Sequence, residues 1–417
     1  MTALAERATT ARRLETETWV VGAPRLLAGL DRAARLDLRA HLAVHGPLPA
    51  VEIDRLLSYA DAVRLAGRGG AGFPLASKLR SLAEGQRHIV VNGSESEPAS
   101  QKDRVLLRRA PHLMLDGALA VAQATRARRV TVAVHDAAAA ASVRAAVAER
   151  PDARHVRVRK ITAGFVSGEA RAVVRALKGG PAKPHGRRTP DTLTGTFVSN
   201  VETFAQLAIL LRIGPHRFAD TGTHAEPGTT LLTVGGAVRR PGVVEIPIGT
   251  PLGIVLAAAG APAYPQAVIV GGYHGAWIAQ NSHVRLSRTG LAAAGGAFGA
   301  GVVLVLDDTT CALGELARVT GWLAAQSARQ CGPCRFGLPA LAADVAALVA
   351  GQRALTAAFG HVRAVEGRGA CAHPDGAARF VTSGLHILQD ETERHLVHGG
   401  CGRPIAGQLP IETVSTR

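Results

Sequence analysis

The sequence predicts a multidomain protein in which an α/β domain comes first, a compact β-rich domain with one helix second, and a helical domain last. A chain of 417 residues is too long for one ordinary core. Strand-like and helix-like runs alternate over residues 87–228, β-rich runs start at residue 229, and helical spacing dominates after residue 306. We therefore expect domains at 1–228, 229–305 and 306–417, with roughly the first 50 residues peripheral to the first domain.

The first domain shows the alternation of a largely parallel sheet. Residues 87–92, 129–134 and 155–161 are rich in Val and Ile, which favours strands. Between and after them, residues 111–125 and 168–177 carry helical spacing. Strands that alternate with helices in this way predict an α/β layer.

The second domain is marked by turn residues. From Thr229 the chain reads TTLLTVGGAVRRPGVVEIPIGTPL, in which a Gly-Gly and a Pro-Gly pair separate two β-rich runs. A short Ala-rich helix follows, and the β-rich pattern ends near Leu306. We expect a compact β domain with one helix.

The third domain is predicted to be helical. Residues 313–326, 338–350 and 377–397 have helical spacing, and Leu338, Leu341, Val345 and Leu348 would share one apolar face. The cysteines of this region lie in the links between the expected helices.

Composition narrows the classes of function. The net charge is +16, but the Arg residues are scattered without interleaved aromatics, which disfavours nucleic-acid binding and leaves an acidic electron-transfer partner as the alternative. The first 13 residues lack an apolar core, and no run approaches ~18 apolar residues. We expect a soluble, cytoplasmic protein with no membrane insertion. Five cysteines, an odd number, suit metal ligation better than disulfides.

A glycine-rich loop is the first candidate cofactor site. Residues 66–74 read AGRGGAGFP, and the backbone N–H groups of such a loop can converge on a phosphate. Pro74 suits the first turn of a helix, and Lys78 follows as a candidate counter-charge for phosphate. A tight turn without a ligand is the alternative interpretation.

A second candidate site follows the first predicted strand. Residues 90–98 read VVNGSESEP, and ligands bind where the strands of open α/β sheets end. Asn92 offers hydrogen bonds to a heterocycle, and Glu95 and Glu97 offer them to sugar hydroxyls. The alternative is a charged surface turn. The segments SGEA at 167–170 and SNVET at 199–203 are weaker signals of the same kind.

Three cysteines indicate a metal centre. Cys331 and Cys334 form a Cys-x-x-Cys pair, and Cys371 lies in GACAHPDG. Iron–sulfur clusters take thiolates from a short run plus a remote cysteine. Two alternatives remain: a zinc site, which usually needs a fourth ligand in another pair, and a redox dithiol, which needs a thioredoxin-like unit.

Five motifs in one order resemble a known family. They are GRGGAGFP, NGSESEP followed by Lys102-Asp103-Arg104, SGE, NVET and CGPCRFG. Over residues 60–390 the chain resembles the flavin-binding F subunit of NADH:quinone oxidoreductase, respiratory complex I, and the diaphorase subunits of NAD-linked hydrogenases and formate dehydrogenases. The resemblance implies an FMN-binding α/β domain, a ubiquitin-like (SLBB) β-grasp domain and a C-terminal helical bundle that holds a 4Fe-4S cluster.

The resemblance also implies a reaction and partners. In the family, hydride passes from NADH to FMN and single electrons pass to the cluster. A thioredoxin-like 2Fe-2S subunit usually accompanies the flavin-binding one, and the acceptor here would be of the quinone-chain or ferredoxin-like type. NADH is the expected substrate.

Site residues follow from the resemblance position by position. Glu97 would lie near the nicotinamide and Glu169 in the nucleotide cleft, and both are expected to take part in catalysis. The expected metal ligands are Cys331, Cys334 and Cys371. The expected cofactor-binding residues are Gly67, Arg68, Gly69, Gly70, Ala71, Gly72, Phe73, Lys78, Asn92, Glu95, Gly168, Lys183 and Asn200.

Several positions depart from the family pattern. An acidic contact becomes Ser94, a carboxylate becomes Ala170, and two adenine-stacking aromatics fall at Ser81 and Gly186. Each lost stack is worth roughly 1–3 kcal/mol on the nucleic-acid scale, so these departures affect NADH more than FMN. A flavin-linked electron relay that does not oxidise NADH is therefore an alternative hypothesis.

The cluster motif departs as well. The first cysteine of the family run falls at Ala328, which leaves three thiolates for the cluster. The cluster would keep an open iron, contract to 3Fe-4S, recruit another ligand or be absent, and its absence would indicate a non-catalytic paralogue. Cys311, Cys401 and, more weakly, His373 are candidate replacements, although the role of a buried small apolar residue suits Cys311 better than ligation.

Overall fold

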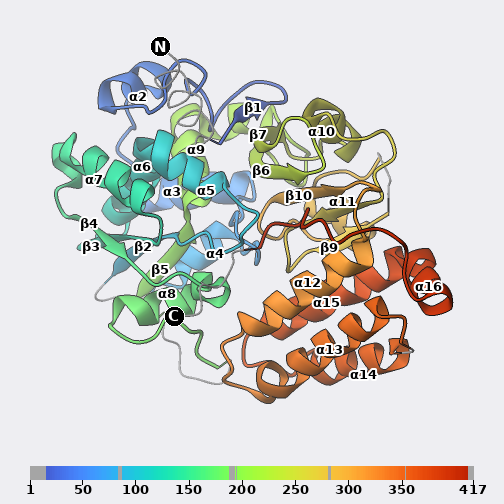
Figure 1. The fold of residues 1–417 in the computed structure, drawn as a ribbon. Coiled ribbons are helices and arrows are strands. Elements are labelled where there is room, and N and C mark those ends of the chain that lie inside the picture. The colour runs from blue at the N-terminus through green and yellow to red at the C-terminus, as the bar shows by residue number, and fades with distance from the viewer. Residues whose placement is uncertain are drawn as a thin grey trace, which may run out of the picture.

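The computed structural model describes residues 16–82, 87–186, 193, 195–279, 283–352 and 354–411. Two sheets and a helical bundle make up these residues, and Figure 1 shows the bundle (orange to red) beside both sheets. Within the described part of the chain, no helix is long and apolar enough to cross a membrane.

The first sheet is four-stranded and parallel, in the order β4-β3-β2-β5. Its strands are β2 (His88–Gly93), β3 (Arg129–Val134), β4 (Val156–Lys160) and β5 (Thr196–Asn200). The Val and Ile side chains of the central strands are fully buried because helices cover both faces. The predicted α/β layer is confirmed, and its three predicted strands lie within a residue or two of their expected bounds.

The helices of the first domain pack around this sheet. They are α2 (Leu38–His45), α3 (Ile53–Ala62), α4 (Leu75–Arg80), α5 (Lys102–Arg109), α6 (Pro111–Ala124), α7 (Ala137–Ala148), α8 (Ala170–Leu177) and α9 (Val201–Ala219). A kink interrupts α9 at Gly214, directly before Pro215. The short 3₁₀ turns Pro151–Ala153 and Phe165–Gly168 complete the domain.

The second sheet is six-stranded and mixed, in the order β1-β7-β6-β10-β8-β9. Its strands are β1 (Thr18–Val20), β6 (Thr229–Gly236), β7 (Gly242–Pro247), β8 (Ala267–Val270), β9 (Ala276–Ile278) and β10 (Val302–Leu306). Helices α10 (Leu252–Ala259) and α11 (Arg288–Ala293) lie beside it, so the domain has one helix more than expected.

The N-terminal segment is integrated into the fold, although the sequence suggests a peripheral position. β1 pairs with β7, and Trp19 is buried in the core of the second sheet. The buried carboxylate of Glu245 on β7 accepts the backbone N–H groups of Arg25, Leu26 and Leu27 at 2.9–3.0 Å. These contacts join residues more than 200 positions apart, which sequence patterns do not reveal.

The bundle consists of α12 (Ala312–Ala325), α13 (Leu338–Val349), α14 (Leu355–Val365), α15 (His373–Ile387) and α16 (Gln389–His398), with a π-helical turn at Pro333–Gly337. The shared apolar face of α13 is buried as expected. The prediction of a single helix over 377–397 is wrong: the chain forms two helices that meet at Leu388.

A buried ionic group fixes the first domain on the second. The ammonium of Lys102 donates to Glu202, and the other oxygen of Glu202 accepts from Thr230 and Leu231.

Candidate active site and iron–sulfur centre

One cavity of about 610 Å³ lies where the three domains meet. Its wall includes the glycine loop, the carboxyl ends of β2 and β5, the start of α8, a loop of the second domain and the loop before α15. Of the residues expected from sequence, the wall contains Gly67, Gly69, Gly70, Ala71, Gly72, Phe73, Lys78, Asn92, Glu97, Gly168, Glu169, Asn200 and Cys371. Segments that are more than 300 residues apart in sequence therefore share one space.

The glycine loop is closed at its base and open at its tip. Gly67 donates its N–H to the carbonyl of Phe73 at 2.9 Å, and Ala66 pairs with Pro74 across an isolated bridge. Gly72 has φ +56°, and any side chain there would strike the guanidinium of Arg288. Phe73 is 55% exposed at the rim. The loop therefore presents backbone to the cavity, as phosphate binding requires.

Lys78 lies deeper, on α4. Its ammonium donates to the carbonyl of Val198 on β5 and lies 5.4 Å from the centre of the Phe197 ring. Burial lowers the pKa of this amine from its ordinary value. Lys78 thus places its nitrogen against the wall of the cavity.

Two amide side chains mark the ends of the strands. Asn92 donates its Nδ2 hydrogen to the carbonyl of Gly168 at 2.8 Å, and a Cβ at Gly168 would strike the hydroxyl of Ser96. Glycine at this position is what lets the α8 segment approach β2 so closely. Asn200 caps α9 by accepting from the N–H of Thr203 and also donates to Asp103 at 3.2 Å. These contacts hold the two amides in the cavity wall.

Glu97 is buried between the first two domains. Its Oε2 accepts the N–H of Tyr273 at 2.8 Å, and its Oε1 has no hydrogen-bond partner among the described residues. Burial raises the pKa of Glu97 to about 7 against the opposing effect of its backbone hydrogen bonds. This carboxyl can therefore bind or release a proton near neutral pH.

Glu169 caps α8, where its carboxylate accepts the N–H of Ala172 at 3.3 Å. It remains a member of the cavity wall.

Three expected residues lie elsewhere. Glu95 uses both oxygens at the start of α5, where it accepts from Ser100 and from the N–H groups of Asp103 and Arg104. Arg68 lines a smaller neighbouring cavity of about 10 Å³. Lys183 is exposed beside Pro184, which does line the main cavity. Residues that are close together in these sequence motifs therefore do not all line the same cavity.

The three expected thiols lie at one end of the bundle. Burial, followed by the neighbouring Cys331 and then Cys371, raises the pKa of the Cys334 thiol to about 12. Cys371 belongs to the cavity wall, and Ala328 is 4% exposed nearby in sequence. His373 is an unsuitable replacement ligand because its Nε2 donates to the carbonyl of Leu323 at 2.9 Å and its Nδ1 faces His274 at 3.0 Å.

Cys311 and Cys401 lie too far away to complete the cluster. Cys311 caps the start of α12, whereas the carbonyl that His373 contacts, Leu323, belongs to its last turn. The 14 residues of α12 span about 21 Å at 1.5 Å each.

An aromatic and histidine group lies in the cavity wall beside Cys371, and sequence reasoning missed its member His274. Phe165 meets the rings of His274, Trp322 and His373 edge-on, with ring centres 4.6, 5.1 and 5.6 Å apart. Burial lowers the pKa of His274 well below its usual range, which keeps it neutral. His274 belongs to the second domain, and no local motif connects it with the cysteine loop.

Three family models match successive parts of the chain. The FMN-binding domain of the Nuo51 family matches residues 60–209, the SLBB domain matches residues 231–269, and the iron–sulfur binding region of NADH-ubiquinone oxidoreductase-F matches residues 308–395. The cofactors of the family are thus FMN and a 4Fe-4S cluster.

Whole-chain comparisons agree with the models. The chain is 30% identical over 404 residues to the NADH-quinone oxidoreductase F subunit of Streptomyces coelicolor, covering 89% of this chain and 90% of the relative. Its counterpart in Escherichia coli is 25% identical over 403 residues, covering 84% and 88%. An NAD+-reducing NiFe hydrogenase in its H2-reduced state superposes with a TM-score of 0.78 at 25% identity, over 94% of this chain and 69% of that one.

The residues present fit both cofactors. The cavity combines an exposed glycine backbone, the half-buried amine of Lys78 and an unpartnered oxygen on Glu97, which suits a phosphorylated heterocycle. Cys334 lies close enough to Cys331 and to Cys371 for both to raise its pKa, and three such thiols suit an iron–sulfur cluster with one corner free of protein thiolate. Sequence identity over the whole length, three successive family models and this donor set lead to one conclusion: the chain belongs to the NADH-quinone oxidoreductase F family, whose members are the flavin and iron–sulfur subunits of that enzyme.

Proposed function

We propose that this protein oxidises NADH on an FMN held in the central cavity and passes the electrons singly to a cluster at Cys331, Cys334 and Cys371. The observation that carries the proposal is the place of Cys371, in the wall of the same cavity as the glycine loop, Asn92 and Glu97. A cluster ligand in that wall puts the two redox centres in adjacent positions.

Each part of the cavity wall has a separate role in this proposal. The backbone of the glycine loop and Lys78 bind phosphate, and Arg68 supports the loop from behind. Asn92 and Asn200 orient the flavin at the ends of β2 and β5. The nucleotide side is formed by Phe73, Gly168, Glu169 and, from the rim, Lys183. Glu95 acts indirectly, because its carboxylate accepts the N–H groups of Asp103 and Arg104 and so fixes the start of α5.

When bound, FMN would supply the redox chemistry, because a flavin can accept a hydride from NADH and release the two electrons one at a time. Glu97 is the residue suited to manage the accompanying proton, because it lines the cavity, its buried Oε1 has no hydrogen-bond partner among the described residues, and its pKa is about 7. The neutral His274 and the ring of Phe165 exclude water between the cavity and the cysteine loop.

The terminal acceptor in this proposal is a separate carrier. The relatives are subunits of a quinone oxidoreductase, and this chain superposes on part of an NAD+-reducing hydrogenase, so the carrier is either a thioredoxin-like 2Fe-2S subunit on the path to quinone or a ferredoxin-like protein. The net charge of +16 favours an acidic carrier.

The test is an anaerobic absorption and EPR spectrum of the purified protein before and after addition of NADH. We expect flavin and acid-labile sulfide in the protein, bleaching of the flavin by NADH, and a reduced-cluster EPR signal. Protein that contains neither flavin nor sulfide after reconstitution would overturn the proposal in favour of a non-catalytic paralogue.

One observation favours a second function, a flavin-linked relay that does not accept electrons from NADH. Ser81 and Gly186 occupy positions where the family carries aromatics for adenine, and Ser94 and Ala170 replace acidic contacts. Stopped-flow mixing separates the two functions. Bleaching by reduced ferredoxin and not by NADH would indicate the relay.

A further inference from the structure

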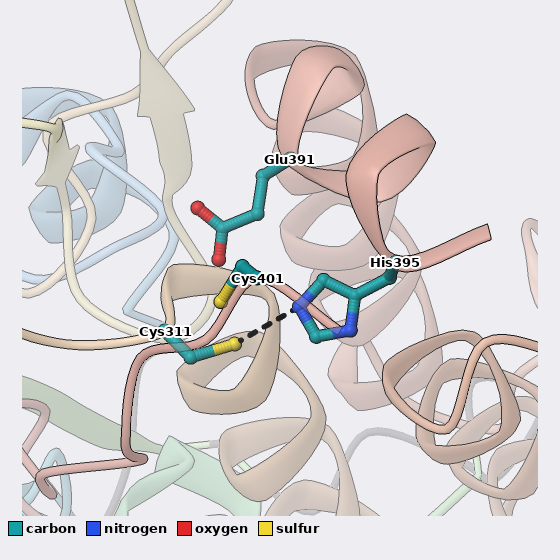
Figure 2. Close-up of side chains that lie close together, drawn as sticks. All are labelled: Cys311, Glu391, His395 and Cys401. Atoms are coloured by element: carbon teal, nitrogen blue, oxygen red, sulfur yellow. Dashed lines mark hydrogen bonds between the residues drawn. The ribbon is translucent and has the colours of Figure 1, made fainter. Parts of the chain in front are cut away.

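A second cluster of metal-binding side chains lies at the end of the bundle opposite the three thiols. It consists of Cys311 at the start of α12, Glu391 and His395 on α16, and Cys401 in the C-terminal tail (Figure 2). One ligand atom from each residue lies within 4.8 Å of all the others, and three of the four residues are buried. Figure 2 shows the four side chains converging on one point from three separate segments.

The distances suit tetrahedral zinc. Zinc binds sulfur at about 2.3 Å and imidazole nitrogen at about 2.0–2.1 Å, which places the two ligand atoms about 3.5 Å apart on a tetrahedron. Cys311 Sγ and His395 Nε2 are 3.4 Å apart. The remaining atoms need to move by only about 1 Å to reach ligand distance.

Neighbouring groups already orient the ligands. His395 donates its Nδ1 hydrogen to the carbonyl of Val349 at 2.7 Å, which leaves the lone pair of Nε2 directed at Cys311. A histidine ligand is usually held in this way by a carbonyl behind it. The N–H of Gly314 donates to Cys311 Sγ at 3.2 Å, a contact that favours the thiolate.

The charges balance. Two thiolates, one carboxylate and Zn²⁺ sum to −1, and a buried site needs a compensating cation. Arg403 supplies it, since its guanidinium donates to Glu391 Oε2 at 2.6 Å. Gln266 donates to the same oxygen, whereas Oε1 accepts the N–H of Leu313 at 3.2 Å and offers its second lone pair to a metal.

We propose that Cys311, Glu391, His395 and Cys401 bind one Zn²⁺ as a closed structural site at the start of α12, whose last turn, about 18 Å away, meets the loop of Cys371. Binding releases the two thiol protons to solvent and involves no electron transfer. The donor set of two sulfurs, one imidazole and one carboxylate favours zinc over magnesium or calcium, which take oxygen ligands.

The site would fasten the C-terminal tail across α12. Beyond Cys401, the carbonyl of Pro404 accepts the N–H of Cys311 at 2.7 Å, and the buried Glu315 accepts the N–H groups of Gly407 and Gln408 at 2.5 and 3.0 Å. A metal at Cys401 would anchor this strap at the point where it leaves α16.

Metal analysis of the full-length protein tests the proposal. In protein from cells grown in medium that contains zinc, elemental mass spectrometry should find about one zinc per chain, in addition to iron. We expect Cys401→Ser and His395→Ala to lower zinc at least about fivefold and to leave iron unchanged. Cys371→Ser is the matched control, since it should lower iron and keep zinc.

A second measurement covers variants that fold poorly. Wild-type protein that is depleted of zinc but keeps its iron should develop visible d–d bands and a thiolate-to-cobalt absorption on titration with Co²⁺, and zinc should displace them. Three results would each overturn the proposal: less than about 0.2 zinc per chain without cobalt bands, zinc that persists in both Cys401→Ser and His395→Ala, or a Cys311–Cys401 disulfide in the intact mass of protein purified in air. Loss of zinc without loss of flavin or sulfide separates this question from the proposed activity.

Discussion

At the scale of single residues, Glu97 concentrates the unusual chemistry of the cavity. Its carboxyl is buried, one of its oxygens has no partner among the described residues, and its pKa is raised to about 7. A carboxyl whose pKa is raised by folding binds its proton more tightly in the folded state than in the unfolded state. Its contribution to stability is therefore fully present below pH 4.5 and lost as the pH rises through 7.

Replacing Glu97 by glutamine should remove this pH dependence. A rise in pKa from 4.5 to about 7 corresponds to about 3 kcal/mol. Glu97→Gln should therefore gain stability relative to the wild type as the pH rises from about 5 to about 8, by up to about 3 kcal/mol. Urea unfolding at several pH values measures the difference, and a difference that does not change with pH would contradict the assigned pKa.

Ala328 offers a direct test of the incomplete cysteine set. Ala328→Cys should add a fourth thiolate, so that the 4Fe-4S cluster withstands brief exposure to air, whereas the wild-type cluster converts to 3Fe-4S. EPR spectra before and after exposure follow the conversion. Ala328→Ser is the matched control of similar size, and equal resistance in the serine and cysteine variants would show that the added thiol is not a ligand.

At the scale of elements, the junction between α5, α9 and β6 depends on one buried cation. Lys102 lies 2.7 Å from Glu202 and 3.1 Å from Asp103, and all three side chains are nearly inaccessible. Glu202 in turn accepts from Thr230 and Leu231 on the second domain. The two carboxylates tolerate burial because the ammonium neutralises part of their charge.

Removal of this cation should be costly. Lys102→Met leaves two buried carboxylates uncompensated and should lower the free energy of unfolding by about 3–5 kcal/mol. Urea denaturation at neutral pH gives the value. The double variant Lys102→Met, Glu202→Gln should recover part of the loss, and an additive loss in the double variant would indicate that charge is not the cause.

Elements were predictable where the pattern is local. The Val-rich runs that became β2, β3 and β4 and the apolar face of α13 follow from periodicity, because burial of one face dictates the residue types. The break between α15 and α16 was missed because Leu388 and its neighbours include neither Gly nor Pro. Helix α9 was missed because Pro215 and Gly214 suggest a loop, whereas the helix continues through a kink there.

The candidate site likewise contains residues that local sequence motifs predict and residues that they do not. The glycine loop, Asn92 and the three cysteines carry local motifs that the family resemblance makes specific. His274 carries none, because its position depends on contacts among three domains. The grouping of Cys311 and Cys401 with His395 required the packing of α16 against α13, whose C-terminal carbonyl at Val349 holds the imidazole.

At the scale of the whole molecule, charge predicts how the protein meets its electron acceptor. A net charge of +16 attracts an acidic carrier over the Debye length, about 10 Å at 0.1 M salt. Reduction of an acidic ferredoxin-like acceptor should slow at least about tenfold between about 0.02 and about 0.5 M NaCl. An uncharged quinone acceptor is the control and should show little change. Equal salt dependence for both acceptors would argue against electrostatic docking.

The place of Cys371 in the cavity wall has a consequence for how such a chain is reused. If the flavin pocket and the first cluster share one wall, electrons can leave the flavin without any other protein in position. The pair then forms a transferable unit that can evolve against different carriers while its internal step stays the same. A likeness to both a quinone oxidoreductase component and a hydrogenase is what such modularity would produce.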